Sequence, residues 1–365
     1  MSTRVLLHAF STFALGGPQA RFVQLANALG SGYEHIVVAM DNRYEAGDRL
    51  LPQVRWRPMK HQWAKGGMLT NRGECRRLLR QLRPDLLLSY NWGAIEWAAA
   101  NLPRMVPQVH VEDGFGPDEA LGQLPRRVWT RRALLGLGRV PVVVASRRLE
   151  AMACEAWRLA PDSVHYLANG VKLPDREPDL GVKVDHGDRP LCIGTLAGLR
   201  PEKNLARMIR AFAAVRARWP ARLVLVGEGP QRAKLQALAQ SLGVANDVEF
   251  TGYLTNPGVR LAEFDLFALS SDTEQLPMAL LEAMALGIPT VATRVGDIEA
   301  VLAGVAPGNL CEPNDEAFEK ALFSAIEQRP RWPDWAEKGR AVVQSRYSEH
   351  QMLQSWQNVF DGRLN

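Results

Sequence analysis

The chain has 365 residues, of which 47% are hydrophobic and 23% charged, and its formal net charge is +5. These values fit a globular protein of about two domains. They exclude a membrane-spanning chain, because no apolar run approaches the roughly 18–20 residues that a spanning helix needs. The N-terminus has no apolar stretch typical of a signal peptide, and the four cysteines form no C-x-x-C pair. We therefore expect free thiols and a cytoplasmic location.

The first half of the chain alternates short apolar runs with helical patterns. Helical patterns at Pro18–Leu29 and Gly73–Leu82 lie between runs that read as strands. Such alternation predicts a parallel sheet with helices on both faces. The predicted strands are Arg4–Phe10, His35–Met40, Leu86–Tyr90, Gln108–Val111 and Val140–Ala145.

Positive charge is concentrated in this half. Residues 1–172 contain 23 Lys and Arg against 14 Asp and Glu, a charge of +9, whereas the remainder has 21 against 25, a charge of −4. The segment from Arg126 to Arg132 adds Trp129 to its arginines. One interpretation is a solvated helix face, and the other is contact with an anionic membrane surface or acceptor. No recognised nucleic-acid-binding motif is present, so we expect no nucleic-acid partner.

The alternation stops at residues 173–189, which are polar, aperiodic and rich in Pro and Gly, as in a linker. It then restarts, with helical patterns that include Leu205–Trp219, Gln231–Leu242 and Pro277–Leu286. The predicted organisation is an N-terminal domain at 1–172, a C-terminal domain at 190–345, and a final helix within 346–365 that packs back toward the first domain. The predicted strands of the second half are Leu191–Thr195, Leu223–Val226, Val248–Phe250, Leu266–Leu269 and Thr290–Ala292.

Two doubly wound domains side by side create a cleft, and ligands bind beyond the carboxyl ends of parallel strands. The strongest candidate site follows the fourth predicted strand of the second half. Glu274 lies just before a helix that Pro277 can start, and Glu282 lies on the first turns of that helix. Free backbone N–H groups from about Met278 to Leu280 suit a diphosphate. The two carboxylates bracket this anion and suit the hydroxyls of a sugar and a ribose. The alternative is an exposed helix with capping acids.

A second candidate follows the strand Leu191–Thr195. Arg200 and Lys203 stand three residues apart, just before a helix that Asn204 can cap. A guanidinium and an ammonium together neutralise a diphosphate and can stabilise it as a leaving group. Taken alone, the same residues are equally compatible with surface charges at a helix start.

A third, weaker candidate is Leu15-Gly16-Gly17-Pro18, after the first strand. Glycines allow the backbone to approach a ligand closely at a helix N-terminus. The pattern is not the dinucleotide fingerprint G-x-G-x-x-G.

Several of these motifs together resemble the retaining GT-B glycosyltransferases of family 4. The similarity is dense over residues 191–302 and sparse in the first half, where it rests on Gly16-Gly17, His110 and Ala145-Ser146. The fold implied is two Rossmann-like domains facing across a cleft, with the domain at 1–172 on the acceptor side and the domain at 190–345 binding the donor. The motifs of the dense part are the E-x7-E spacing of Glu274 and Glu282 with LLEAMALGIPTVAT, G-x-R-x-x-K-N at Gly198–Asn204, Asn169-Gly170-Val171, Val226-Gly227-Glu228-Gly229-Pro230, and Phe250-Thr251-Gly252-Tyr253.

The resemblance implies a role for each candidate residue. Glu274 would hold a hydroxyl of the donor sugar, Glu282 the ribose, and Arg200 with Lys203 the diphosphate. His110 would face the donor sugar across the cleft. The family retains the anomeric configuration without a protein nucleophile, because the leaving phosphate assists deprotonation. The remaining implied contacts are the backbone of Gln275, Leu276, Pro277, Met278 and Ala279 with sugar and phosphate, and Gly16 and Gly17 with phosphates and acceptor.

Glu112 and Asp113, which follow His110, form a separate hypothesis. Two glycines and four acids within ten residues at a strand end are typical of a ligand-binding loop. These two carboxylates could bind acceptor hydroxyls or assist proton removal. A structural role for the lone histidine is the alternative. No D-x-D motif and no metal-ligand spacing is present, so we expect no cofactor and activity without a bound metal.

The resulting prediction is a retaining glycosyltransferase that uses a UDP- or GDP-sugar and a glycan or lipid-linked acceptor. Its pathway would be bacterial lipopolysaccharide or other cell-surface polysaccharide assembly, with peripheral association at the inner face of the plasma membrane through the basic N-terminal domain. The alternatives are a nucleotide-sugar 2-epimerase on the same fold and a non-catalytic nucleotide-sugar-binding protein. A dinucleotide-dependent oxidoreductase is disfavoured, because Arg232 stands where a third glycine is expected.

Overall fold

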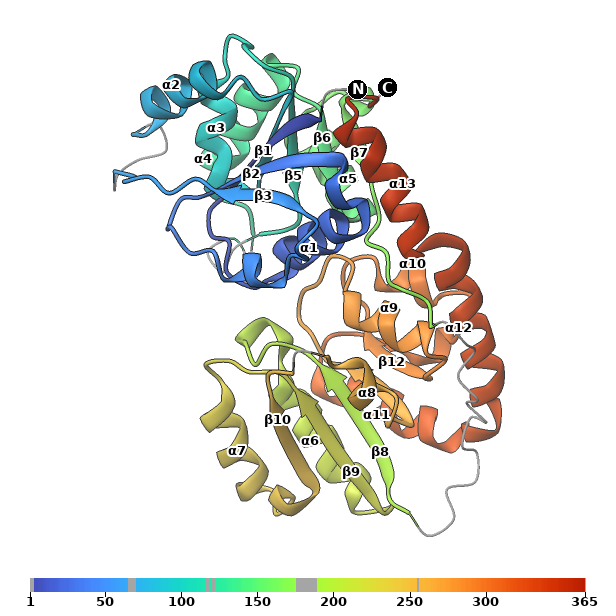
Figure 1. Ribbon diagram of the computed structural model, residues 1–365. Coiled ribbons are helices and arrows are strands. Elements are labelled where there is room, and N and C mark those ends of the chain that lie inside the picture. The colour runs from blue at the N-terminus through green and yellow to red at the C-terminus, as the bar shows by residue number, and fades with distance from the viewer. Residues whose placement is uncertain are drawn as a thin grey trace. The chain divides into compact units, whose positions relative to one another are not determined.

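The computed structural model describes residues 3–64, 70–115, 119, 122–174, 189–254 and 256–364 (Figure 1). It consists of two compact units. The first comprises Met1–Asn169 together with Met352–Asn365, and the second comprises Gly170–Gln351. Most of the predicted linker, 173–189, lies outside the described residues. No helix in the described ranges combines the length and the apolar character that crossing a bilayer requires.

The first unit contains a seven-stranded sheet in the order β3-β2-β1-β4-β5-β6-β7, in which every pair is parallel. From β1 the chain continues to β2 and β3 on one side of the sheet, and from β4 it continues to β5, β6 and β7 on the other side. The sheet therefore has a switch point between β1 and β4. The strands are β1 (Arg4–Phe10), β2 (Tyr33–Ala39), β3 (Arg55–Pro58), β4 (Leu86–Tyr90), β5 (Gln108–Glu112), β6 (Val142–Val144) and β7 (Val164–Tyr166).

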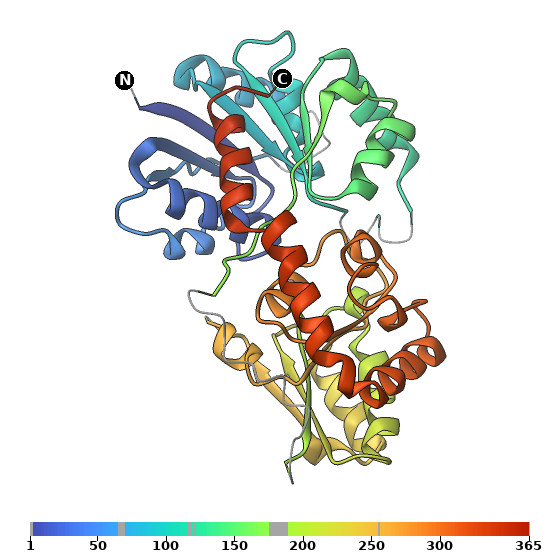
Figure 2. The same cartoon turned by 90° about the vertical axis from the view of Figure 1, so that its right-hand side faces the viewer.

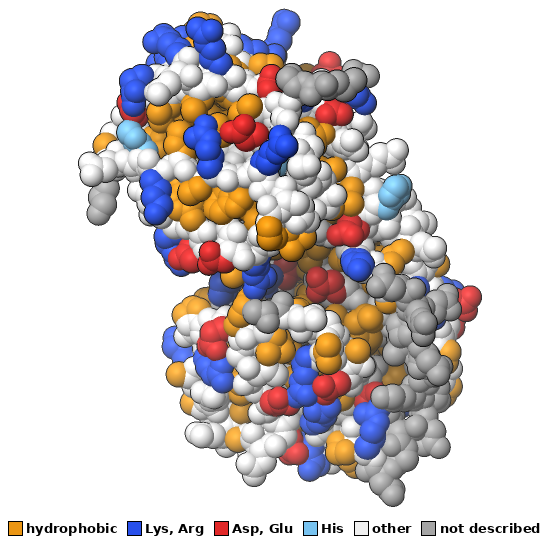
Figure 3. Space-filling model, in the orientation of Figure 1, with side chains coloured by type: hydrophobic (Ala, Val, Ile, Leu, Met, Phe, Trp, Pro, Cys, Tyr) orange, Lys and Arg blue, Asp and Glu red, His pale blue; other side chains and the backbone are white. Residues whose placement is uncertain are grey.

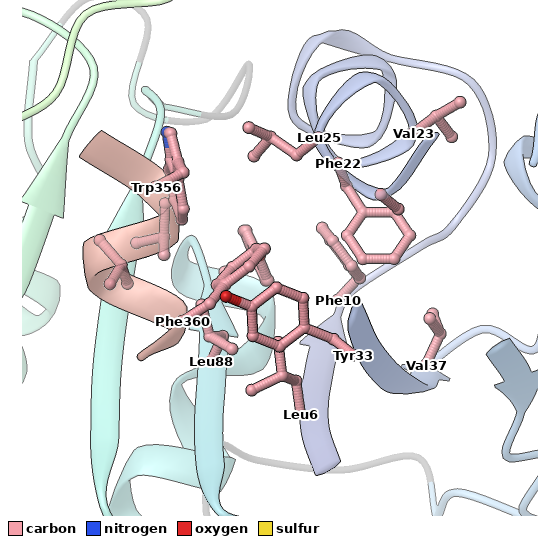
Figure 4. Packing of buried hydrophobic residues seen from close by; sticks show 14 of the residues in the cluster. Leu6, Phe10, Phe22, Val23, Leu25, Tyr33, Val37, Leu88, Trp356 and Phe360 are labelled. Carbon is pink, nitrogen blue, oxygen red and sulfur yellow. The ribbon is translucent and has the colours of Figure 1, made fainter. Parts of the chain in front are cut away.

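Alternate residues of β1 fill two cores, one on each face of this sheet. Leu6 and Phe10 pack with residues of α1 and α13, whereas Leu7 and Ala9 pack against α2 and α3. Figure 4 shows Trp356 of α13 among the aromatic and aliphatic side chains of the first of these cores. The helices are α1 (Gly17–Leu29), α2 (Arg72–Leu82), α3 (Ile95–Ala100), α4 (Pro125–Arg131), α5 (Arg147–Glu155) and α13 (Glu349–Phe360).

The C-terminal helix α13 belongs largely to the first unit. Figure 2 shows it running along the strands and helices of that unit. Trp356 and Phe360 are fully buried, and the hydroxyl of Tyr33 donates a hydrogen bond to Asp361 at 2.8 Å. The last residues of the chain therefore complete a core whose other buried members lie between Leu6 and Val143.

The second unit contains a six-stranded parallel sheet in the order β10-β9-β8-β11-β12-β13, with a switch point between β8 and β11. The prediction of two doubly wound parallel sheets is thus confirmed. The strands are β8 (Leu191–Leu196), β9 (Ala221–Val226), β10 (Val248–Gly252), β11 (Leu266–Leu269), β12 (Thr290–Thr293) and β13 (Leu310–Cys311), and the helices are α6 (Leu205–Arg216), α7 (Arg232–Ser241), α8 (Gly258–Leu261), α9 (Met278–Ala285), α10 (Ile298–Leu302), α11 (Asp315–Glu327) and α12 (Trp332–Arg346).

Candidate functional site

The switch point of the second sheet brings two predicted residues together. Lys203 lies in the loop after β8 and Glu274 in the loop after β11, and these strands are hydrogen-bonded neighbours. The Lys203 Nζ atom lies 2.6 Å from Glu274 Oε1, and the hydroxyl of Ser271 donates to the same oxygen at 2.7 Å. The side chains of Lys203 and Glu274 are 19% and 10% exposed. The sequence placed these residues 71 positions apart, and sheet order makes them an ion pair.

A buried arginine that sequence reasoning missed connects the loop that carries Glu274 to the loop after β13. Arg207 on α6 is 4% exposed, and its guanidinium donates to the carbonyl oxygens of Ser270 at 2.7 Å and Pro313 at 2.6 Å. It also pairs with Asp272 at 2.8 Å. A signal was available, because this arginine falls on the face of α6 that carries Met208 and other apolar residues. An arginine there must find internal partners.

The loop that carries Glu274 is also fixed from its other side. Gly296, in the loop after β12, has a φ of +60°, and a Cβ at this position would lie 2.4 Å from the carbonyl oxygen of Glu274. The backbone N–H of Asp297 donates to the Gln275 carbonyl at 2.9 Å, and the Thr293 hydroxyl donates to the Ser271 carbonyl at 2.6 Å. Only glycine permits this close approach of two backbones.

Helix α9 begins one residue later than its sequence predicts. Pro277 has an extended conformation as the N-cap, and the helix starts at Met278. The N–H of Leu280 already donates to the Pro277 carbonyl at 3.2 Å. The expected set of free donors from Met278 to Leu280 therefore shortens to Met278 and Ala279, which precede the first bond of the helix.

Glu282 occupies an environment unlike that of Glu274. It is half-buried on α9, between the buried residues Leu281 and Ala283. Burial raises the pKa of the Glu282 carboxyl above its ordinary value. Among the described residues no cation pairs with it, so this carboxylate has hydrogen-bonding capacity that a hydroxyl group can use.

Arg200 stays at the surface. Its side chain is 58% exposed, and its nearest recorded partner is Glu202 at 3.5 Å. Asn204 caps α6, as the sequence predicts, by accepting a hydrogen bond from the backbone N–H of Arg207 at 3.3 Å. The guanidinium of Arg200 therefore lies beside a loop whose conformation the helix cap fixes.

The glycines after β9 have a packing explanation. A Cβ at Gly227, where φ is +144°, would lie 2.0 Å from the Ala197 carbonyl oxygen, and one at Gly229 would lie 2.5 Å from the Leu199 carbonyl oxygen. These residues are glycines because the loops after β8 and β9 touch. Gly227 and Gly229, which together with Arg232 match the dinucleotide fingerprint only in part, are thus explained by packing.

The sequence suggested that His110 lies at a strand end. In the structure of the first unit it lies inside β5, which continues to Glu112. His110 is fully buried, with its Nδ1 atom 2.9 Å from the Ser89 hydroxyl and its Nε2 atom 3.5 Å from Glu112. Glu112 is also fully buried and pairs with Arg131 at 3.1 Å, which lowers the pKa of the Glu112 carboxyl despite its burial. Glu112 thus has no exposed surface, and its predicted contact with acceptor hydroxyls would require breaking this pair.

Asp113 follows β5 and is bound by Arg21 of α1, which donates to it in a bidentate pair with one contact at 2.8 Å. The backbone N–H of Asp113 donates to Asn91 at 2.7 Å. Gly16 and Gly17 are exposed at the start of α1, and a Cβ at Gly17 would meet no atom within 4 Å. The roles predicted for these residues stay predictions.

The described part of the chain holds no group of three or more His, Cys, Asp or Glu side chains suited to a metal ion. Activity without a metal remains a prediction, which a chelator series with manganese rescue can test.

Comparison with known families gives two matches that together cover most of the chain. The family described as Glycosyltransferase Family 4 matches residues 15–174, and that described as Glycosyl transferases group 1 matches residues 181–342.

Similar curated proteins match mainly over part of their length. An N-acetyl-alpha-D-glucosaminyl L-malate synthase of Bacillus anthracis is 28% identical over 45% of this chain and 44% of its own. A lipopolysaccharide core biosynthesis glycosyltransferase, LpsD, of Rhizobium meliloti is 28% identical over 44% and 46%. A GDP-mannose-dependent alpha-(1-6)-phosphatidylinositol monomannoside mannosyltransferase of Mycolicibacterium smegmatis is 31% identical over 50% and 48%. The chain thus spans about half the length of these relatives.

Solved structures match over the whole chain at low identity. Anabaena Alr3699/HepE in complex with UDP aligns with a TM-score of 0.79 and 16% identity, covering 99% of this chain and 100% of the other. At this identity the likeness establishes the fold.

Proposed function

The chain belongs to the GT-B glycosyltransferases of family 4, and from this premise we propose that it moves a sugar from a nucleoside-diphosphate sugar to an acceptor hydroxyl. The observation that carries the proposal is the Lys203–Glu274 pair at the switch point of the second sheet, 2.6 Å apart and partly exposed. A nucleotide sugar carries groups that suit both members, because its diphosphate attracts the ammonium and its sugar hydroxyls donate to the carboxylate.

Each donor group then has a residue of matching chemistry in the second unit. Lys203 and Arg200 hold the diphosphate together with the N–H groups of Met278 and Ala279 at the start of α9. Glu274 accepts from a sugar hydroxyl, and Glu282 accepts from the ribose. The predicted backbone contacts run from Gln275 to Ala279 in the same loop.

In the proposed reaction the bond between the anomeric carbon and the phosphate oxygen breaks, and the diphosphate leaves with the electron pair. The two cations stabilise the charge that develops on it. The acceptor oxygen forms its bond to the same face of the anomeric carbon and gives its proton to the leaving phosphate. The configuration is therefore retained and no protein nucleophile is required.

We propose a glycan or lipid-linked acceptor in polysaccharide or lipopolysaccharide biosynthesis, at the inner face of the plasma membrane. The names of the relatives support this, since one refers to a lipopolysaccharide core and another to a phosphatidylinositol mannoside. His110, Gly16 and Gly17 are kept as proposed contacts of the donor. Asp113 is kept as a proposed acceptor contact.

The decisive experiment is a screen of UDP- and GDP-sugars without acceptor, with the released nucleoside diphosphate as the readout. We expect hydrolysis of one donor by the wild type and a loss of about tenfold or more in Glu274→Gln and Lys203→Met. Glu316→Gln and Lys320→Met are matched controls, because this pair lies on the surface with exposures of 79% and 73%. Release of a free epimerised nucleotide sugar would support the 2-epimerase instead. Wild-type hydrolysis in both site variants would overturn the assignment.

A further inference from the structure

One segment of the first unit has an extreme charge composition. Between residues 120 and 149 the chain contains seven arginines and no Asp or Glu. In the second unit both signs are mixed, as Figure 3 shows, and Arg222 pairs with Glu263 at 3.3 Å and Arg232 with Glu228 at 2.5 Å. The excess of positive charge therefore belongs to the first unit, and within it this segment contains no acid at all.

The outer face of this segment exposes large apolar side chains. Helix α4 continues into a π-helical turn, Arg132–Leu137. The side chains of Trp129 and Leu137 are 65% and 87% exposed, and Leu124 before them is 39% exposed. Ala133 between them is exposed as well. Because a π-helical turn closes over more residues than an α-helical one, residues four apart stay on one side of the helix.

Exposed arginines accompany these apolar groups along the segment. Arg126, Arg132 and Arg139 are all exposed, and the Arg132 guanidinium lies 5.2 Å from the centre of the Trp129 ring. A large aromatic ring beside cations, next to an exposed leucine, is the combination that binds at the boundary between lipid head groups and acyl chains.

The inner face anchors the segment firmly. The fully buried Arg131 lies 3.1 Å from Glu112 and 3.4 Å from Glu119, with its guanidinium 4.8 Å from the Trp157 ring centre. Arg127 pairs with Glu119 at 2.9 Å. Glu112 and Glu119 thus pair with the inner arginines, and among the described residues no acid pairs with Arg126, Arg132 or Arg139. The inner contacts hold the apolar groups on a fixed element.

We propose that this outer face, formed by Leu124, Arg126, Trp129, Arg132, Ala133, Leu137 and Arg139, docks on an anionic lipid surface. Charge complementarity selects that occupant, since anionic lipid attracts clustered arginines and the acyl boundary accepts the exposed Trp129 and Leu137. The proposal draws on the proposed function for its purpose, which is to bring the protein to a lipid-linked acceptor. The binding itself needs neither donor nor acceptor.

The test is flotation of the full chain with vesicles of phosphatidylcholine alone or with about 30% phosphatidylglycerol. We expect at least about tenfold more binding to the anionic vesicles, weakened at about 0.5 M salt. Trp129→Ala with Leu137→Ala should lower binding about tenfold, and Arg126→Gln with Arg132→Gln should abolish the preference for anionic lipid. Val259→Ala is the matched control, an apolar residue 72% exposed on the second unit.

Equal binding by the wild type and the Trp129/Leu137 variant would overturn the proposal, as would equal binding to both vesicle types. A wild-type dimer that this variant converts to a monomer, with no vesicle binding, would identify the face as a contact between two copies and also overturn it. Donor hydrolysis should be unchanged in all these variants. Hydrolysis without vesicle binding removes only the docking surface, whereas vesicle binding without hydrolysis of any donor removes only the proposed function.

Discussion

Replacing Glu274 by Gln is expected to tighten the binding of free nucleoside diphosphate while it slows sugar transfer. In the structure the Lys203 ammonium already forms an ion pair with Glu274, with 2.6 Å between Nζ and Oε1. A nucleoside diphosphate can take Lys203 away but brings no sugar hydroxyl for the carboxylate, which is left 10% exposed without a cation. A nucleotide sugar brings both groups. The pair therefore favours the sugar-loaded donor over the spent nucleotide.

The size of the effect follows from the exposure of the pair. Surface ion pairs contribute about 0–1 kcal/mol, whereas breaking a fully buried pair costs about 3–5 kcal/mol. Side chains that are 19% and 10% exposed lie between these limits, so about 1–2 kcal/mol is expected, or roughly 5–30-fold in Kd. In the Glu274→Gln variant the side-chain amide oxygen can still accept the hydrogen bond that Ser271 donates at 2.7 Å in the wild type, so the loop should keep its conformation.

Calorimetric titration with UDP and GDP measures this change, with Glu316→Gln as the exposed control. Removing any negative charge near a diphosphate also raises affinity by simple repulsion, so Glu274→Gln must be repeated in a Lys203→Met background. If the pair is the cause, the gain should largely disappear there. A gain of the same size in both backgrounds, or weaker binding by the single variant, would refute the reasoning.

Three further perturbations follow from the same loops. Because burial raises the pKa of Glu282, stability should fall as pH rises from the ordinary glutamate pKa through the raised one, and Glu282→Gln should remove this loss. The melting temperature of the Glu282→Gln variant should exceed that of the wild type by about 2–4 °C at pH 8, and the two should converge near pH 4, as thermal unfolding can measure. Gly296→Ala, which would put a Cβ 2.4 Å from the Glu274 carbonyl oxygen, should destabilise by about 2 kcal/mol or more in urea unfolding and lower donor turnover. Arg207→Met leaves the Ser270 carbonyl without its donor, so we expect a loss of about 1–3 kcal/mol by the same method and a raised KM for the donor.

Most of the strands that the sequence predicted are buried on both faces of a parallel sheet, and the edge strand β10, where Glu249 is exposed, is an exception. Leu86–Tyr90 and Leu266–Leu269 are fully buried runs, and such runs stand out in any sequence. The edge strand β3, with the sequence RWRP, did not stand out, because its side chains are mostly exposed and can be polar. The two-residue strand β13 is too short to produce a pattern.

Individual site residues could be predicted where charged side chains directly follow a strand. Their interaction partners could not be predicted, because these depend on which elements become neighbours in the fold. Lys203 and Glu274 could be identified individually, but their pairing depends on β8 and β11 being neighbours, which local pattern does not encode. Arg207 has no motif and is identified only by its buried position on α6. Arg131 was grouped with surface arginines, yet it is fully buried, because it is the counter-charge that an acid inside strand β5 requires.

Two ion pairs of the same chemistry thus have opposite consequences for function. Arg131 and Glu112 are both 0% exposed, and separating them would leave two buried charges, so they hold the fold around β5. Lys203 and Glu274 keep 19% and 10% of their surface, so water or a ligand can reach both groups and replace one partner by another at moderate cost. A charged residue after a strand is available to a substrate only when its protein partner can be exchanged in this way. By that criterion the loops after β8 and β11 can exchange a partner, whereas the buried carboxylate inside β5 cannot.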